Sequence, residues 1–177
     1  MDPSFRNWGL AYCEYENGVI TILKTEVLQF KEPQGMKRNQ ADIISCTELF
    51  AALDQAMFEF DPDVVVAEIP VGSQSSRAAN GYGICMALLG ALSTYKPKLV
   101  HVSPNQVKAV VGSRTASKGD VIDWVLTNHP TVPFPRRGGE VVSSKSEHMA
   151  DAIVALHAAT KLQTFKDAIH AISNHTE

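Results

Sequence analysis

One short apolar stretch constrains the fold more than any other part of the sequence. Residues 64–67 form an uninterrupted apolar run (VVVA), which follows the helix-breaking segment 61–63 and ends at a carboxylate, Glu68. Such a run is typical of a central strand that is covered on both faces. Ligands of open α/β sheets bind beyond the carboxyl ends of the parallel strands. Glu68 is therefore either a site residue or a strand-end residue that simply reaches water.

The composition indicates one globular domain. The chain has 177 residues, 45% of them hydrophobic, and a net charge of -3. A chain of this length can bury a substantial core as a single domain over 1–177. The net charge excludes a grossly basic protein, although a local basic face can still bind nucleic acid. Three cysteines without metal-type spacing are interpreted as reduced core thiols: Cys13, Cys46 and Cys85.

The sequence shows no targeting or membrane-spanning segment. No apolar run approaches the ~20 residues of a membrane span, and no signal peptide is recognisable. We therefore expect a soluble protein without a membrane partner. Its expected location is the cytoplasm of a bacterial cell, or that of the host if the gene belongs to a phage.

The periodicity of apolar residues predicts an alternation of strands and helices. The Asn17-Gly18 dipeptide joins apolar segments over 8–15 and 19–28, which predicts an antiparallel hairpin. In order, we then expect a loop over 30–39, a helix over 40–60, the strand over 64–68, a helix over 77–94, a strand over 98–102, helices over 105–111 and 118–128, an irregular connection over 130–146, a helix over 147–163 and a helical piece to about residue 170.

This order predicts an α/β fold of the RNase H-like type. Right-handed crossovers give a mixed sheet that opens with the antiparallel hairpin and carries helices on both faces. The core of this domain is expected over about 2–162, with 163–177 as a C-terminal helical extension and tail.

Two of the predicted helices have distinctive faces. The helix over 40–60 carries an apolar stripe typical of core packing: Cys46, Phe50, Leu53, Met57 and Phe60. The helix over 77–94 is rich in small residues: Ala78, Ala79, Gly81, Gly83, Ala87, Gly90 and Ala91. Small residues allow close approach of another backbone, so tight packing over the sheet and a subunit interface are both open explanations.

Four residues are candidates for one site: Asp2, Glu68, His148 and Asp151. His148 and Asp151 stand three positions apart on an expected helix, so both project from one face. Mg²⁺ binds through few carboxylates, and two such ions can activate water and stabilise the leaving oxygen in phosphodiester hydrolysis. Simpler explanations remain open: a turn residue at Asp2, a surface histidine, and helix-dipole stabilisation of Asp151.

The sequence resembles the RuvC family of Holliday junction resolvases in four blocks that follow the family's order. The blocks are 2–9 (DPSFRNWG), similar to an opening DPG…G motif; 60–68 (FDPDVVVAE), similar to an F-x-P-D…E block; 106–118, with Gln106-Val107-Lys108, Gly112 and Ala116-Ser117-Lys118; and 148–152 (HMADA), similar to an acidic motif that begins with Asp or His. The resemblance spans the chain from Asp2 to about Ala159.

The resemblance implies that Asp2, Glu68 and Asp151 are catalytic, metal-binding carboxylates and that His148 is the fourth member of the site. It implies Mg²⁺ as the cofactor, with two ions per site. The imidazole of His148 suggests that Mn²⁺ can substitute, because imidazole is a softer ligand than carboxylate. Alternatively, His148 positions or protonates a leaving oxygen.

The resemblance also implies DNA-binding residues. Lys108 and Lys118 match family lysines near the DNA backbone, where they would neutralise charge that develops on the scissile phosphate. The alternative is two solvated surface lysines. We expect Arg136, Arg137 and Lys145, in the long connection before the last main helix, to lie next to the site and to grip phosphates.

Three features depart from the family pattern. The family has an apolar strand before the first aspartate, whereas only Met1 precedes Asp2, so half of a central strand is missing and Asp2 is expected beside a charged, fraying terminus. Ile69 follows Glu68 where the family often has an aromatic residue that enters the junction, and Tyr82 is the nearest aromatic. The connection before the last main helix is longer than expected.

We therefore predict a metal-dependent, structure-specific endonuclease that resolves Holliday junctions or other branched DNA and leaves 5′-phosphate and 3′-hydroxyl ends. Symmetric incision needs two active sites and hence a homodimer, for which the small-residue helix over 77–94 is the candidate interface. One alternative is a non-catalytic module that binds branched DNA, favoured by the missing strand. Another is a nuclease of the same fold that acts on RNA–DNA hybrids or transposon ends.

Overall fold

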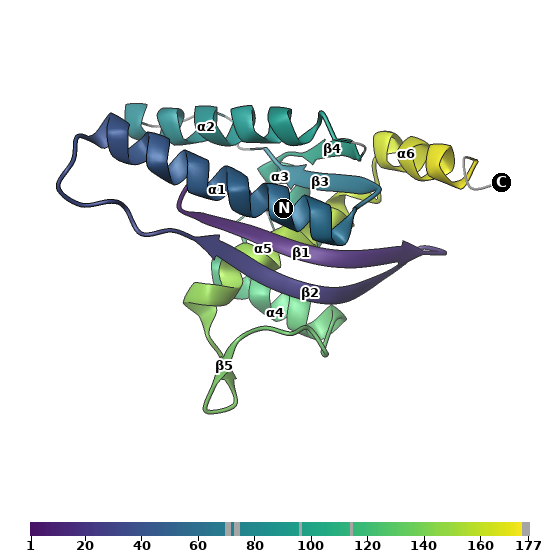
Figure 1. Cartoon of the computed structure of the whole chain (residues 1–177). Helices are drawn as coiled ribbons and strands as arrows, with labels where there is room; N and C mark the ends of the chain where they lie inside the picture. Colours follow the sequence, from purple (N-terminus) through teal and green to yellow (C-terminus); the bar gives the residue numbers. More distant parts are fainter. Residues whose placement is uncertain (70–71, 73–74, 96, 114, 175–177) are drawn as a thin grey trace.

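A computed structural model describes residues 1–69, 72, 75–95, 97–113 and 115–174. Within these residues the elements in chain order are β1 (Asn7–Glu16), β2 (Val19–Gln29), α1 (Arg38–Phe60), β3 (Val64–Glu68), α2 (Ser76–Leu92), β4 (Lys98–Val102), α3 (Pro104–Val111), α4 (Lys118–Asn128), β5 (Arg136–Arg137), β6 (Glu140–Val141), α5 (Ser143–Ala159) and α6 (Gln163–Ser173) (Figure 1).

The predicted antiparallel hairpin opens the fold. β1 and β2 pair from Asn7 opposite Gln29 to Glu16 opposite Val19. The turn residues Asn17 and Gly18 both have positive φ values, of 52° and 84°, which suits the Asn-Gly sequence because these two residue types tolerate that conformation best. The hairpin is therefore determined locally, by its turn.

A parallel pair of strands forms the other half of the sheet. β3 and β4 run in register, from Val64 opposite Lys98 to Glu68 opposite Val102. β3 is largely buried, because helices cover it on the two faces, and this explains its run of β-branched residues. β4 buries Val100 and Val102 and exposes Lys98 and His101. The carboxyl end of β3, and with it Glu68, reaches the edge of the sheet.

Met1 and Asp2 join the two halves of the sheet. The amino group of Met1 donates to the Val66 carbonyl at 2.7 Å, and the Glu68 amide donates to the Met1 carbonyl at 3.1 Å. Asp2 exchanges two backbone hydrogen bonds with Gly9, at 2.9 and 3.0 Å. The expectation of a fraying terminus at Asp2 is thus wrong, because main-chain bonds hold it from both sides. Burial lowers the pKa of the Met1 ammonium to about 6.

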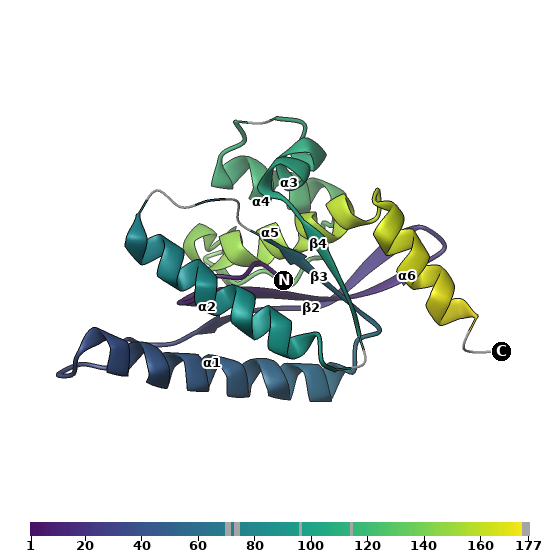
Figure 2. The same cartoon turned by 90° about the horizontal axis from the view of Figure 1, so that it is seen from above.

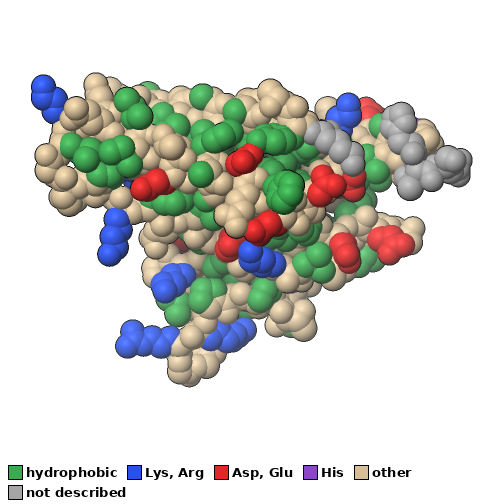
Figure 3. Space-filling model, in the orientation of Figure 1, with side chains coloured by type: hydrophobic (Ala, Val, Ile, Leu, Met, Phe, Trp, Pro, Cys, Tyr) green, Lys and Arg blue, Asp and Glu red, His purple; other side chains and the backbone are tan. Residues whose placement is uncertain are grey.

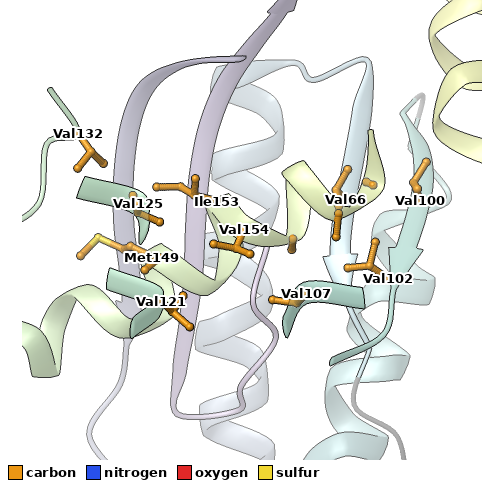
Figure 4. Packing of buried hydrophobic residues seen from close by; sticks show 14 of the residues in the cluster. Val66, Val100, Val102, Val107, Val121, Val125, Val132, Met149, Ile153 and Val154 are labelled. Atoms are coloured by element: carbon orange, nitrogen blue, oxygen red, sulfur yellow. The ribbon is translucent and has the colours of Figure 1, made fainter. Parts of the chain in front are cut away.

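Helices cover both faces of the sheet, as predicted. α1 and α2 lie on one side and α3, α4 and α5 on the other (Figure 2). α1 and α2 bury Trp8, Leu49, Leu53 and Leu89 against β1 and β3. The opposite layer is built from valines and from the inner face of α5 (Figure 4): Val66, Val100, Val102, Val107, Val121, Val125, Val132, Met149, Ile153 and Val154.

Capping residues fix where the helices around the site begin. Ser103 accepts a hydrogen bond from the Gln106 amide at the start of α3, with Pro104 at the first helical position as predicted. Ser117 caps α4 in the same way, and the Asp120 carboxylate accepts a hydrogen bond from the Ser117 amide. α2 is capped by Ser75, not by Ser76 as the sequence suggested.

The region over 130–146 is more ordered than predicted. It contains the short β5–β6 hairpin, in which Arg136 pairs with Val141 and Arg137 with Glu140. Gly138 and Gly139 make its turn with positive φ values. α5 then begins at Ser143 and ends at Ala159, so the predicted helix over 147–163 was placed about one turn too late.

The predicted apolar stripe of α1 is confirmed in part: Leu53 and Met57 are buried, and Cys46 and Phe50 pack against the core as partly buried side chains. The buried residues are Ala41, Ser45, Leu49, Leu53, Ala56 and Met57, whereas Phe60 is 37% exposed. Burial of Ser45 is possible because the Arg6 guanidinium donates a hydrogen bond to its hydroxyl. Of the three cysteines, only Cys85 is buried, whereas Cys13 and Cys46 are partly exposed.

The last helix, α6, packs on the sheet beside α5. Phe165 enters the core and stacks edge-on against Tyr15 of β1, with ring centroids 5.1 Å apart. No helix among the described residues is both long enough and apolar enough to cross a membrane.

Candidate active site

Three segments that are far apart in the sequence bring the four predicted site residues together. Asp2 is held by its bridge to β1, Glu68 ends β3, and His148 and Asp151 lie in the second and third turns of α5. The Nδ1 atom of His148 lies 2.6 Å from Oδ2 of Asp2. α5 packs directly against β1 and β3, which places its amino-terminal half over the carboxyl end of the parallel strands.

A glycine makes this close approach possible. A Cβ atom built on Gly9 would lie 2.1 Å from the carbonyl oxygen of His148. No side chain fits there, because real Cβ contacts are essentially never closer than 3.0 Å. Gly9 is also the residue that pairs with Asp2. One residue without a side chain therefore sets the distance between β1 and α5 and, through it, the position of both members of the Asp2–His148 pair.

Two carboxyl groups of the site have raised pKa values. Burial, followed by the charges of Asp2 and Asp151, raises the pKa of Glu68 to about 7. Burial, followed by the charge of Asp2, raises the pKa of Asp151 to about 7. In each case the charged form loses solvation and meets like charges. Strongly raised carboxyl pKa values at one end of a sheet are a mark of functional sites.

His148 partly balances these negative charges. The hydrogen bond to Asp2 raises the pKa of His148, and burial opposes that rise. Its second ring nitrogen, Nε2, lies 3.6 Å from Oε1 of Glu147. Protonated His148 would thus lie between two carboxylates, and neutral His148 that keeps its proton on Nδ1 would present Nε2 as a lone-pair donor.

Glu147 is a site neighbour that the sequence interpretation missed. Its Oε2 atom forms an ion pair of 2.7 Å with Nζ of Lys118, and this contact raises the pKa of Lys118. The signal was present, because Glu147 and Asp151 are four positions apart and such residues share one face of a helix. Lys118 therefore lies at the rim of the site, where its charge also favours the ionised form of Asp151.

The other predicted basic residues lie at different places around the site. Lys108 is in the last turn of α3, and its charge favours the ionised form of Glu68. Arg136 and Arg137 are exposed on the β5–β6 hairpin, which projects from the body of the protein (Figure 1). Lys145 is exposed in the first turn of α5. Lys and Arg side chains gather around this hairpin on one face (Figure 3).

The donor set suits a hard divalent cation. Within the described residues, no three His, Cys, Asp or Glu side chains are already arranged as a coordination sphere. The chemistry of the donors nevertheless fits such an ion, because oxygen ligands are what Mg²⁺ prefers. A cation between Glu68 and Asp151 would relieve the repulsion and desolvation that raise both pKa values.

The architecture is an RNase H-like fold, as predicted: the β1–β2 hairpin and the parallel β3–β4 pair are linked at one end through Met1 and Asp2, and α5 packs against both. Solved structures of RuvC-like proteins share it. RuvC from Thermus thermophilus in complex with a Holliday junction substrate superposes with a TM-score of 0.66 at 21% identity, over 90% of each chain. A second structure of Thermus thermophilus RuvC gives 0.63 at 21% identity, over 96% of this chain and 93% of that one.

A eukaryotic protein shows the same likeness. The yeast mitochondrial Holliday junction resolvase Ydc2 superposes with a TM-score of 0.56 at 16% identity, over 98% of this chain and 83% of that one. No protein-family model matches the sequence, and no curated protein matches it either. The RuvC-like fold is thus visible in three dimensions, at an identity too low for these sequence comparisons.

Proposed function

We propose that the protein is a metal-dependent, structure-specific endonuclease that cleaves branched DNA and leaves 5′-phosphate and 3′-hydroxyl ends. The observation that carries this proposal is the convergence of Asp2, Glu68, His148 and Asp151 at the carboxyl end of β3, with a 2.6 Å contact between Asp2 and His148. Carboxylates that are clustered at a strand end, two of them with raised pKa values, suit phosphodiester hydrolysis assisted by cations.

In this proposal Asp2, Glu68 and Asp151 hold Mg²⁺, two ions per site, with Mn²⁺ as a substitute. When bound, the ions would supply an activated water and would stabilise charge on the scissile phosphate. His148 orients the Asp2 carboxylate through Nδ1 and offers Nε2 either as a further ligand or as a proton donor to the leaving oxygen. Lys108 neutralises negative charge beside Glu68.

The basic residues are proposed to hold the DNA backbone. Lys118 lies at the rim, within 2.7 Å of Glu147, and Lys145 is exposed two residues before Glu147. Arg136 and Arg137 extend this surface along the projecting hairpin (Figure 3). Such contacts add affinity and position the duplex without reading its sequence.

The choice of branched DNA rests on the fold. Two of the proteins with similar structures are a RuvC bound to a Holliday junction and a Holliday junction resolvase. The residue that would open the junction centre is not assigned. Ile69 follows Glu68 where an aromatic was expected, and residues 70 and 71 lie outside the described part of the chain. Tyr82 on α2 is 37% exposed and remains the nearest candidate.

Symmetric cleavage of a junction would need a two-fold homodimer, and α2 is the proposed interface. Four small residues are exposed along one side of this helix: Ala79, Gly83, Ala87 and Gly90. A Cβ atom on Gly83 or Gly90 would meet nothing within 4 Å, so intramolecular packing does not explain why these glycines are small. Close approach of a second α2 helix would explain it. Size-exclusion chromatography with light scattering tests this point.

The proposed activity is tested with a synthetic four-way junction. We expect cleavage with Mg²⁺ or Mn²⁺ and none with excess chelator. Glu68→Gln and Asp151→Asn should each bind the junction as the wild type does but lose cleavage, by about 10²-fold or more. Asp123→Asn, at an exposed position on α4, is the matched control and should cleave normally.

Each alternative has its own outcome in the same experiment. Junction binding without metal-dependent nicking would indicate a non-catalytic module. Preferential cleavage of an RNA–DNA hybrid or of a linear duplex would retain the nuclease and change its substrate. Near wild-type cleavage by both Glu68→Gln and Asp151→Asn would contradict the proposed site.

A further inference from the structure

Two histidines from different helices meet outside the candidate active site. His129 directly follows α4, and His157 lies in the second half of α5. Their Nε2 atoms lie 2.7 Å apart, and their ring centroids are 5.0 Å apart. His157 stands six positions after Asp151, which is ~9 Å further along the helix axis at about 1.5 Å per residue. The histidine pair is therefore separate from the four residues of the candidate active site.

The fold holds both rings in place. The His129 amide donates to the Val125 carbonyl at 2.7 Å, and the His129 carbonyl accepts from the Val132 amide at 3.0 Å. The ring of His157 packs edge-on against Trp124, with centroids 4.9 Å apart. α4 lies along α5 (Figure 2), and this packing brings together two imidazoles that are 28 positions apart in the sequence.

Both imidazoles are in the form that binds metal ions. Burial lowers the pKa of His129, and burial followed by the charge of His129 lowers the pKa of His157 to about 4. Near pH 7 both rings are therefore neutral, and each has one nitrogen with a lone pair. Among the described residues, neither Nδ1 atom has a hydrogen-bond partner. Each ring can thus keep its proton on Nδ1, which leaves both Nε2 lone pairs for a metal ion.

The spacing of the rings suits a tetrahedral ion. Zn²⁺ binds histidine nitrogens at about 2.0–2.1 Å, and two such ligands at the tetrahedral angle have ring centroids ~5.2 Å apart and nitrogens ~3.3 Å apart. The centroids already have nearly that separation, at 5.0 Å. The rings need only turn in place until the two Nε2 atoms point to a common position. Both side chains are partly exposed, which leaves room for this turn.

We propose that His129 and His157 form a binding site for a divalent transition metal ion of the Zn²⁺ type, which links the end of α4 to α5. Imidazole suits Zn²⁺, Cu²⁺ and Ni²⁺, whereas Mg²⁺ prefers oxygen ligands. The described residues supply no third His, Cys, Asp or Glu ligand here, so water would complete the coordination. The proposal does not depend on the proposed nuclease activity.

One positive charge opposes the bound ion. Lys161 is exposed one turn after His157, and its charge contributes to the lowered pKa of His157. It would repel a metal cation as it repels a proton. With two protein ligands and a lysine nearby, the site should be weaker than a structural zinc site with four ligands. Lys161→Gln should bind Zn²⁺ about 2–5-fold more tightly, as expected for the loss of one exposed charge.

Calorimetric titration of the full chain with Zn²⁺, at neutral pH and with Mg²⁺ in excess, tests the proposal. We expect His129→Gln and His157→Phe each to lose at least about tenfold in Zn²⁺ affinity. Glu68→Gln should keep this affinity, because it alters only the candidate active site. His101→Gln, at an exposed position on β4, is the matched control and should also keep it. Saturating Zn²⁺ should raise the Tm of the wild type by roughly 3 °C.

Tryptophan fluorescence locates the ion. Co²⁺ is a paramagnetic substitute for Zn²⁺, and bound beside His157 it should quench Trp124, whose ring is 4.9 Å from that of His157. Trp124→Phe should abolish the quenching but keep the Zn²⁺ affinity. The second tryptophan, Trp8, is fully buried in the opposite layer and should not respond.

The outcomes that contradict the proposal are distinct. Unchanged Zn²⁺ affinity in His129→Gln would overturn it, and this variant decides the matter even if His157→Phe fails to fold, because His129 is partly exposed at the end of a helix. Binding that disappears in Glu68→Gln would place the ion at the carboxylates. A wild-type protein that binds no Zn²⁺ would also overturn the proposal.

Discussion

The Nδ1 atom of His148 and the Oδ2 atom of Asp2 lie 2.6 Å apart, although the residues are 146 positions apart in the sequence. The contact ties the start of the fold to α5 and leaves Nε2 of His148 directed at the acidic part of the site, 3.6 Å from Glu147. An imidazole in this place should make the protein more tolerant of Mn²⁺ than an all-carboxylate site would be.

His148→Asp tests the role of this imidazole. A carboxylate is harder than an imidazole, so we expect the ratio of cleavage rates in Mn²⁺ and Mg²⁺ to fall while activity in Mg²⁺ is retained. His148→Ala should lose about 10²–10⁴-fold in either metal. An unchanged metal ratio in His148→Asp would show that the imidazole does not act as a ligand.

Gly9→Ala should disturb the same contact from the opposite side. The new Cβ atom would lie 2.1 Å from the His148 carbonyl, so β1 and α5 must separate. Overpacking of this kind costs about 1–3 kcal/mol, and we expect a lower Tm together with weakened cleavage. Gly119→Ala is the control, because its Cβ atom would lie at an ordinary 3.6 Å from the Ser117 hydroxyl. That variant should be as stable as the wild type or slightly more so.

The sequence contains the strand and helix signals that place the site, but not the distances within it. The valine run of β3, the Asn-Gly turn and the Ser-Pro start of α3 are local signals, and the structure agrees with each of them. The bonding of Met1 to Val66 and of Asp2 to Gly9 is a tertiary event that no local pattern encodes.

Other parts escaped prediction for identifiable reasons. The two strands of the β5–β6 hairpin have two residues each, too short for any periodicity. On α1 the predicted stripe included Phe60, which is 37% exposed, and omitted Ser45 and Ala56, which are buried. Close packing with neighbouring elements selects small residues there, and Arg6 satisfies the buried hydroxyl of Ser45.

Glu68→Gln should stabilise the metal-free protein at alkaline pH. The pKa of Glu68 is raised from 4.5 to about 7 in the folded state, so its protonated form contributes stability that is complete below about pH 4.5 and is lost as the pH rises through about 7. In chelator, the variant should therefore have the higher Tm at pH 8, and the difference should vanish near pH 4.5. Differential scanning fluorimetry across this range measures it.

The same variant reports on the cation. Mg²⁺ or Mn²⁺ should raise the Tm of the wild type at pH 8, because binding to the folded state alone stabilises it. Glu68→Gln should show a much smaller rise. An equal rise in both proteins would place the cation elsewhere.

Lys118 and Glu147 should have opposite effects on DNA binding. Their side chains form an ion pair of 2.7 Å, with Lys118 mostly exposed. If Lys118 contacts a phosphate, Lys118→Gln should weaken junction binding and reduce the slope of log K against log salt by about 1. Glu147→Gln should tighten binding, because it removes a negative charge and releases the lysine. Lys166→Gln, on α6, is the control. No change of slope in Lys118→Gln would exclude the phosphate contact.

A histidine pair away from the site should govern stability in acid. The Nε2 atoms of His129 and His157 lie 2.7 Å apart, and His157 packs edge-on against Trp124. Burial, followed by the charge of His129, lowers the pKa of His157 from 6.5 to about 4. The stability that neutral His157 contributes is therefore present above pH 6.5 and is lost as the pH falls through about 4.

His157→Phe keeps a ring against Trp124 but cannot be protonated, so its Tm should fall less than that of the wild type between pH 6.5 and 4. His101→Gln, at an exposed position on β4, is the control and should keep the wild-type dependence of Tm on acid pH. If the Tm of His157→Phe falls as steeply as that of the wild type, the acid sensitivity belongs to other groups.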